Sequence, residues 1–156
     1  ATCEVTPQHL TLEGPECYRR LGTLAQMNPP VRDAAHKEAL WEGVRQGLFD
    51  VLGSDHAPHT REEKQGDYPR TPSGMPGVQT LLPLMLDHVA AGRLTLERLV
   101  DLTAHGPQRI FGLVGKGRLA PGYDADITLI RGHLVMRDDE LQGKPAGQPL
   151  RFQEAG

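Results

Sequence analysis

The order of apolar and polar residues divides the first third of the chain into two strands with a helix between them. Residues 1–7 are a short β-branched run that ends at a proline, which is typical of a strand leaving its sheet. After a loop, Asp33 is a suitable N-cap for a helix over residues 34–46, and a second strand is expected at residues 48–53. The apolar face of this helix is formed by Leu40, Trp41 and Val44. Strand, loop, helix and strand in this order predict a parallel α/β unit.

The rest of the chain predicts a long loop, three helices and then short strands. Residues 65–77 are rich in proline and glycine, and a loop of this length is usually functional or disordered. Helical patterns follow at residues 78–90, 95–104 and 107–111. From residue 115 turn residues dominate, and short strands are expected at residues 126–130, 134–136 and 149–152. We therefore predict α/β structure in residues 1–113 and a small β subdomain in residues 114–156.

The composition limits the classes of protein to which the chain can belong. With 156 residues, of which 38% are hydrophobic, it is long enough for one domain with a core, whereas a complete (β/α)8 barrel takes about 250 residues. The formal net charge of -3 argues against a nucleic-acid partner, because phosphates attract basic surfaces. No apolar run approaches the roughly 18 residues of a membrane span, so we expect no membrane partner.

The cysteines and the first residue indicate where the protein works and how much of it is present. Cys3 and Cys17 are too few for a disulfide framework and are typical of reduced thiols, which predicts a cytoplasmic protein. The chain starts at Ala1 inside the first expected strand, without a methionine, so we expect it to be a piece of a longer protein.

The densest cluster of ionisable side chains is the segment Gly-Ser-Asp-His-Ala-Pro-His at residues 53–59, directly after an apolar strand. In parallel α/β folds the loops that follow strands build the active site. On an extended chain Asp55, Ala57 and His59 would share one face, while His56 would point away. A carboxylate at such a strand end must be hydrogen-bonded, paired or bound to metal. The alternative is that Asp55 caps a turn and His59 is an ordinary surface imidazole, and spacing alone favours neither interpretation.

Four segments carry a resemblance to a known family. Residues 53–59, with Lys64 shortly after them, resemble the second signature of dihydroorotases, which are zinc amidohydrolases of pyrimidine biosynthesis. Thr-Cys-Glu-Val-Thr-Pro-Gln-His-Leu at residues 2–10 resembles the preceding barrel strand of that family, and Met-Asn-Pro-Pro-Val-Arg at residues 27–32 resembles its substrate-contacting loop. Residues 115–129 resemble the segment in which many amidohydrolases leave the barrel for a small β-sandwich. The resemblance implies an α/β fold, namely the C-terminal part of a (β/α)8 TIM-barrel metallo-hydrolase with strands seven and eight, plus part of that sandwich.

The resemblance also implies roles for five residues. Asp55 ligates zinc and takes a proton from the water that the metal binds, and His59 donates a hydrogen bond to the substrate carboxylate. Asn28 contacts the same substrate, and the backbone around Ser73 and Gly74 meets the pyrimidine ring. The chemistry is consistent with these roles, because a metal lowers the pKa of water toward about 7 and a nearby carboxylate can pass the proton to the leaving nitrogen.

Several functional residues of the family are missing from this chain. The His-x-His pair, the bridging carboxylate, the two later histidine ligands and a substrate-binding arginine lie on barrel strands before residue 1. A zinc site needs three or four protein ligands, and Asp55 supplies one of those needed for a centre of one or two ions. We therefore expect the isolated chain to be inactive, and to aggregate or to associate with copies or with its missing half, because an open half-barrel exposes strand edges and apolar faces.

The activity implied for the full-length protein is the reversible cyclisation of N-carbamoyl-L-aspartate to L-dihydroorotate, in a homo-oligomer. Hydantoinases and allantoinases are the nearest alternatives, although they usually lack the Ala-Pro-His continuation. A second alternative is a non-catalytic scaffold for aspartate carbamoyltransferase, and the retention of both Asp55 and His59 argues against it. A third is that the piece itself is a binding or structural module.

Further residues are expected to be structural. Glu4 should pair with a strand neighbour rather than reach a metal, and His9 should be a structural imidazole. Lys64 should pair locally rather than catalyse. Cys3 should be a buried, inert thiol in its strand, and Cys17 should lie in a polar loop.

Overall fold

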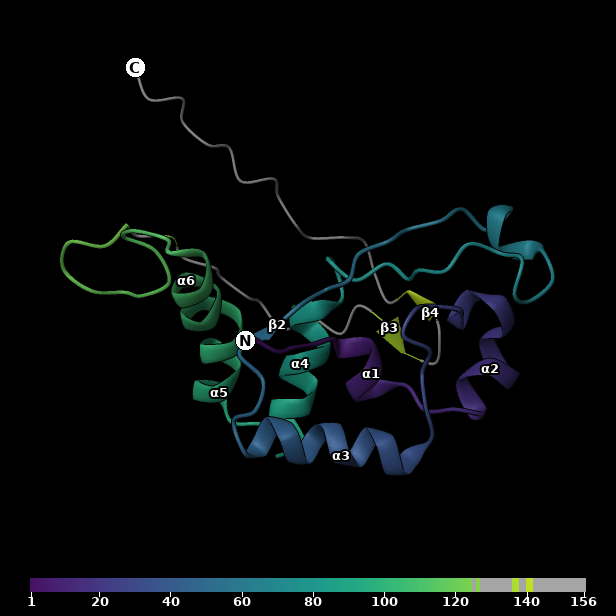
Figure 1. Cartoon of the computed structure of the whole chain (residues 1–156), viewed down its shortest axis with the longest axis horizontal. Coiled ribbons are helices and arrows are strands. Elements are labelled where there is room, and N and C mark those ends of the chain that lie inside the picture. The colour runs from purple at the N-terminus through teal and green to yellow at the C-terminus, as the bar shows by residue number, and fades with distance from the viewer. Residues whose placement is uncertain (125, 127–135, 138–139, 142–156) are drawn as a thin grey trace, which may run out of the picture. The chain divides into compact units, whose positions relative to one another are not determined.

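The computed structural model describes residues 1–124, 126, 136–137 and 140–141 (Figure 1). Residues 1–126 form one compact unit. In the remainder, strand β3 (Met136–Arg137) pairs antiparallel with strand β4 (Glu140–Leu141). The strand predicted at residues 149–152, and all but one residue of each of those predicted at residues 126–130 and 134–136, lie outside the described residues.

Two short parallel strands stand at the centre of the compact unit. Strand β1 (Glu4–Val5) pairs with strand β2 (Val51–Leu52), so that Glu4 lies opposite Val51. Backbone bonds from the amides of Asp50 and Gly53 extend the pairing at both ends. The predicted parallel unit is confirmed, but both strands are shorter than expected. Strand β1 ends early because a helix begins at Pro7.

Three short helices follow β1 where the sequence predicted only a loop, and that prediction is wrong. They are α1 (Pro7–Thr11), α2 (Glu16–Leu21) and the 3-10 helix η1 (Gly22–Ala25). The Thr6 side chain caps α1 by accepting the amide hydrogen of His9, and Pro7 occupies the first helical position, where its missing N–H is no loss. Helices of four to six residues are too short to show the period of 3.6 on which the sequence prediction relied.

Both cysteine predictions are wrong. Cys3 is exposed, and its backbone rather than its thiol is bonded: its amide donates to Asp50 Oδ2 at 2.7 Å, and its carbonyl accepts the amide hydrogen of Asp50 at 2.8 Å. Cys17 lies on α2 with only 4% of its surface exposed, and burial raises the pKa of its thiol.

Helix α3 (Ala34–Arg45) begins where the sequence predicted and ends one residue earlier, with Gln46 as its C-cap. Asp33 caps it by accepting the amide hydrogen of His36 at 3.1 Å, and Gly47 follows its end at a φ of 75°, which favours glycine. Its buried residues include Trp41 and Val44, so the expected apolar face is the face that packs on α1.

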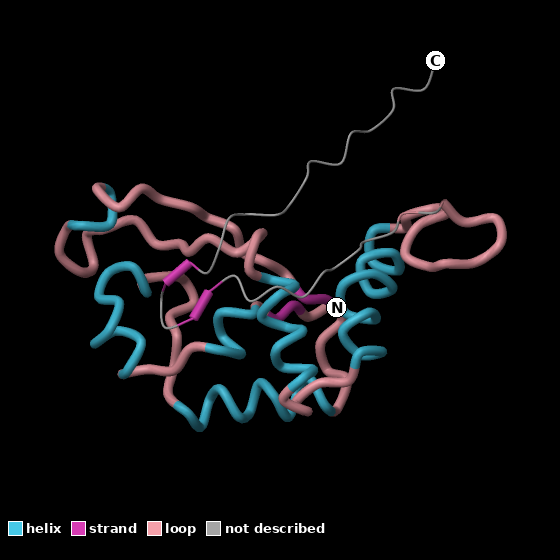
Figure 2. The backbone as a smooth tube through the Cα atoms, turned by 180° about the vertical axis from the view of Figure 1, so that it is seen from behind, coloured by secondary structure: helices cyan, strands magenta, loops and turns pink. Residues whose placement is uncertain are grey.

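The C-terminal half of the unit is a series of helices beyond the long loop, which Figure 2 shows in pink. They are α4 (Leu81–Ala90), α5 (Leu96–Val100), the π-helical turn η3 (Asp101–His105) and α6 (Gly106–Phe111), with η2 (Glu63–Gln65) as a single turn inside the loop. Thr95 caps α5 as predicted, and Gly112 ends α6 in the left-handed conformation. Helix α4 packs on α1 and η3 packs on β2.

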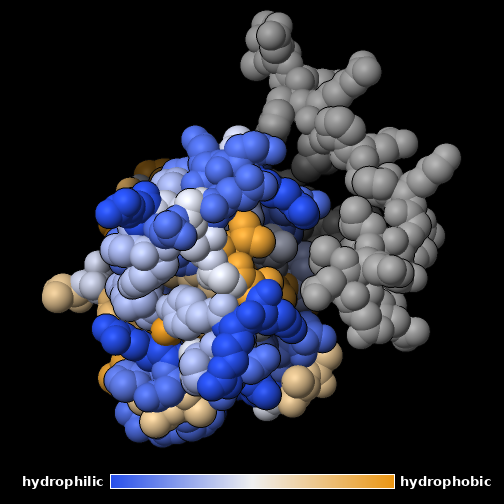
Figure 3. All heavy atoms as spheres, turned by 90° about the vertical axis from the view of Figure 1, so that its right-hand side faces the viewer, coloured by the Kyte–Doolittle hydropathy of each residue, from blue (hydrophilic) through white to orange (hydrophobic). Residues whose placement is uncertain are grey.

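Two apolar clusters lie among the described residues. The larger consists of Val5, Leu10, Trp41, Val44, Leu52, Met85, Leu94, Leu99 and Leu102. The smaller lies around α2 and η1 and consists of Cys17, Ala25, Met27 and Val31. On the face in Figure 3 the surface is largely hydrophilic, with apolar side chains in between. No helix among the described residues is long and apolar enough to cross a membrane.

A buried histidine completes the core between α3 and α4. The ring of His88 stands edge-on to the indole of Trp41 at a centroid distance of 4.8 Å, and its Nε2 shares a hydrogen bond with the hydroxyl of Thr11 at 2.9 Å. Burial, together with the charge of Arg93, lowers the pKa of His88 below its ordinary value of 6.5.

We expect the free energy of unfolding to fall as the pH is lowered from neutral. Between the lowered folded pKa of His88 and the unfolded value of 6.5, the unfolded chain binds a proton that the folded chain excludes. Stability from this group is therefore full above pH 6.5 and is lost as the pH falls through the folded pKa. Urea denaturation at a series of pH values should show this slope in the natural protein and a flatter one in His88→Gln. An equal slope in both would contradict the assignment.

Candidate active site

The backbone turns sharply at Asp55, just after β2. Its φ of 43° lies in the left-handed region, which Asp and Asn tolerate better than most residues. The carbonyl of Ser54 accepts a hydrogen bond from Gln8 Nε2 at 2.9 Å, which ties this turn to α1. The predicted alternation of Asp55, Ala57 and His59 along one extended face is therefore wrong at its first member.

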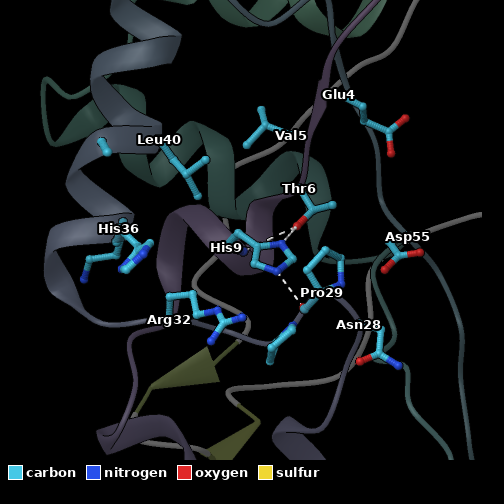
Figure 4. Close-up of a pocket in the computed structure, with 13 residues that line it drawn as sticks. Glu4, Val5, Thr6, His9, Asn28, Pro29, Arg32, His36, Leu40 and Asp55 are labelled. Carbon is cyan, nitrogen blue, oxygen red and sulfur yellow. Dashed lines mark hydrogen bonds between the residues drawn. The ribbon is translucent and has the colours of Figure 1, made fainter.

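The turn places Asp55 on the wall of a cavity of about 560 Å³ (Figure 4). Its other polar lining residues include Glu4, His9, Asn28 and Arg32, and Leu40 of α3 contributes to its apolar side. A volume of this size lies within the range of about 300–1,000 Å³ that is typical of sites for small molecules. The strand end, the loop before α3 and α3 itself thus meet at one cavity.

The two carboxylates of the cavity are without polar partners. Among the described residues, no hydrogen bond or ion pair engages the carboxylate of Asp55 or that of Glu4, and both residues are exposed. The predicted strand neighbour of Glu4 is therefore not found there. Instead its carboxylate lies against Gly53, where a Cβ atom would collide with it, so the glycine makes room for an acidic side chain.

His9 is a structural imidazole, as predicted. Its Nδ1 accepts the hydroxyl hydrogen of Thr6 at 2.7 Å, and its Nε2 donates to the carbonyl of Pro29 at 2.9 Å. Both ring nitrogens are engaged, so His9 fixes the loop of Asn28 to the start of α1, as Figure 4 shows.

The four remaining predicted site residues come from three loops that meet. Asn28 lines the cavity with Asp55, and its Nδ2 donates to Ser73 Oγ at 3.2 Å. Gly74 has a φ of 145° and lies so close to Ala57 that a Cβ atom would be 2.6 Å from the alanine Cβ and 3.3 Å from His59 Nε2. Only glycine allows this approach, which brings residues 73 and 74 against the segment of His59.

His56 and His59 differ in their contacts. His56 forms an isolated parallel bridge with Met75, and its Nδ1 accepts the backbone amide of Gly77 at 3.0 Å, so it fastens the two sides of the long loop. The Nδ1 of His59 lies 3.6 Å from Glu63 Oε2, and the Nε2 faces Gly74. The contacts of His56 therefore give it a structural role.

Lys64 is structural, but its partners are distant in sequence rather than local. Its Nζ donates to the carbonyls of Gln26 at 2.9 Å and Thr23 at 3.4 Å, and only 4% of the residue is exposed. Burial lowers the pKa of this ammonium group. Sequence reasoning also missed Gln8 and Gln26, whose side chains bond across the fold and stand in no recognisable motif.

The described residues contain no group of three or more His, Cys, Asp or Glu side chains that could hold a metal ion. A zinc site needs three or four such ligands. Within this part of the chain, Asp55 can supply one of them, and it has the open carboxylate that a ligand requires.

The sequence matches the Amidohydrolase family over residues 15–149. The chain therefore belongs to the amidohydrolase family. Dihydroorotases of Halobacterium salinarum and Methanosarcina mazei are 49% and 44% identical to it over 130 and 153 residues, which are 83% and 96% of this chain. These matches cover 31% and 33% of the two relatives, so the chain spans about a third of their length.

Solved structures of hydantoinases are similar in fold to most of this chain. An L-hydantoinase (dihydropyrimidinase) from Arthrobacter aurescens is 40% identical, with a TM-score of 0.75 over 80% of this chain and 28% of its own. A D-hydantoinase (dihydropyrimidinase) from Thermus sp. is 29% identical, with a TM-score of 0.72. The fold is thus part of a TIM-barrel-type amidohydrolase.

Proposed function

We propose that this chain is the C-terminal part of a dihydroorotase, whose complete protein catalyses the reversible cyclisation of N-carbamoyl-L-aspartate to L-dihydroorotate. By the complete protein we mean the polypeptide that contains this chain and the remaining barrel strands. The observation that carries the proposal is that Asp55 and Asn28 line one cavity, while Asn28 Nδ2 also donates to Ser73 Oγ at 3.2 Å. The similarity to dihydroorotases over nearly the whole chain supports it.

In this reaction Asp55 acts as the general base and acid. Its carboxylate faces the cavity without a competing partner among the described residues, so it can accept a proton from the attacking water. In the direction of ring opening, the water adds to the amide carbonyl carbon and the C–N bond of the ring breaks. Asp55 then gives the proton to the departing nitrogen.

Asn28, His59 and the backbone of residues 73–74 bind the substrate. The carboxylate of dihydroorotate requires donors, and the amide of Asn28 and the imidazole of His59 supply them. The glycine at position 74 lets the backbone approach the flat ring closely.

The donor set is consistent with a zinc centre of one or two ions to which Asp55 contributes one ligand. The remaining ligands belong to the other strands of the complete protein. When bound, the metal lowers the pKa of water toward about 7. The β-sandwich of residues 114–156, the homo-oligomer, the cytoplasmic location and an association with aspartate carbamoyltransferase remain predictions from the sequence.

Substrate preference tests the proposal. The complete protein should turn over L-dihydroorotate. For dihydrouracil, which lacks the carboxylate, kcat/KM should be lower on the order of 100-fold, because charged hydrogen bonds each contribute about 1.5–3 kcal/mol. His59→Asn should narrow this ratio, whereas His105→Asn, on η3, should leave it unchanged. A faster reaction with dihydrouracil or hydantoin than with dihydroorotate would instead favour a hydantoinase. The structural similarity to the Arthrobacter hydantoinase is the observation in favour of that alternative.

A further inference from the structure

Gln26 joins the loop of Asn28 to the segment that carries Ser73 and Gly74. It is 94% buried, since only 6% of its surface is exposed, and it lies two residues before Asn28. Its backbone carbonyl accepts hydrogen bonds from the amide of Gly74 at 3.0 Å and from Lys64 Nζ at 2.9 Å. One residue thus links the Asn28 loop to both ends of the segment between residues 64 and 74.

The side chain of Gln26 makes a second set of bonds to the same loop. Its Nε2 shares two hydrogens among three acceptors, namely the carbonyl of Thr71 at 2.7 Å, that of Pro69 at 3.2 Å and Ser73 Oγ at 3.3 Å. Its Oε1 accepts the hydroxyl hydrogen of Thr71 at 2.5 Å. Both ends of the amide are therefore occupied, and its orientation is fixed by donors and acceptors of the loop.

These bonds determine what the hydroxyl of Ser73 can do. A serine oxygen has two acceptor lone pairs and one hydrogen to donate. Gln26 Nε2 and Asn28 Nδ2 occupy the two acceptor positions. Among the described residues the hydroxyl hydrogen has no acceptor, so the hydroxyl is left as a donor.

We propose that Gln26 is a positioning residue, which orients the Ser73 hydroxyl as a hydrogen-bond donor to an acceptor oxygen of the substrate and sets its spacing from Asn28. The inference rests on the proposed function, because it takes Asn28 and residues 73–74 to contact the substrate. Gln26 itself is buried and does not touch the ligand. Its effect is expected on substrate binding, while Asp55, which lies outside this network, continues to perform the proton transfers.

The test is the kinetics of Gln26→Met in the complete protein. Methionine is of similar length and can stay buried, but it cannot orient Ser73. We expect KM for dihydroorotate to rise about tenfold, which corresponds to about 1.4 kcal/mol, with kcat changed less than about twofold. Gln46→Met is the matched control and should leave both constants unchanged, because within the described part of the chain Gln46, the C-cap of α3, bonds through its Nε2 only to the exposed Glu42 side chain.

A double-mutant cycle separates positioning from general loosening of the loop. Ser73→Ala alone should raise KM, and adding it to Gln26→Met should raise KM little further, because the hydroxyl is already misdirected. Additive effects, or a loss confined to kcat, would overturn the inference. If Gln26→Met does not fold, Gln26→Glu, which keeps the acceptor for Thr71 but loses the donors, takes its place in the cycle. Failure of the natural protein to turn over dihydroorotate refutes the proposed function, whereas turnover with an unchanged KM in the variants refutes only the role of Gln26.

Discussion

Asp55→Asn in the complete protein should lower kcat for dihydroorotate by about a thousandfold, while the protein stays folded. An amide cannot accept and return a proton, and general acid–base catalysis typically contributes about a hundred- to ten-thousandfold. The fold should tolerate the change, because the side chain is exposed and asparagine accepts a φ of 43° as readily as aspartate. Rates with saturating substrate, together with melting temperatures, measure the two effects separately.

The matched control is Asp87→Asn on the exposed side of α4, which also removes one negative charge but lies outside the cavity lining. It should keep kcat within about twofold, because Asp87 does not line the cavity. It should also change the free energy of unfolding by no more than about 0.5 kcal/mol, as is usual for surface substitutions. Undiminished turnover by Asp55→Asn would refute both the mechanism and the assignment of the cavity as the active site.

The parts of the fold that the sequence predicts are those governed by local chemistry. The cap of α3 at Asp33 and the cap of α5 at Thr95 form as expected, because a side chain and an amide three residues later make them without help from the rest of the chain. The parallel pairing of β1 and β2 also follows from the order of the elements. Such features need no knowledge of distant contacts.

The site depends on distant contacts, and these are the features that the sequence does not predict. The turn at Asp55 is held by the hydrogen bond from Gln8 to the carbonyl of Ser54, two residues that lie 46 positions apart in the sequence. The buried ammonium of Lys64 finds carbonyls 38 and 41 positions away rather than a local acid. An expectation of strand-like alternation fails there because tertiary bonds, not the local pattern, set the backbone.

Trp41→Ala should cost the fold about 3–5 kcal/mol of unfolding free energy, the usual range for removing a large buried aromatic side chain. The residue is 1% exposed and lies in the core between α3 and α4, against His88. Its Nε1 donates to the carbonyl of Leu10 at 2.9 Å, so the truncation leaves a cavity and also a buried carbonyl without its donor. Urea denaturation followed by far-ultraviolet circular dichroism measures the loss.

Two further variants separate the loss of packing from the loss of the hydrogen bond to Leu10. Trp41→Phe keeps most of the packing but removes the indole N–H, and should cost about 1–3 kcal/mol for the unsatisfied carbonyl of Leu10. Leu48→Ala, at a residue that is 63% exposed, should change stability by less than about 0.5 kcal/mol. Because Leu40 and His36 of α3 line the cavity, a loosened α3 should also lower activity at temperatures below the melting point of the natural protein. A Trp41→Ala protein that unfolds at the same urea concentration as Leu48→Ala would show that α3 is not held to the core in this way.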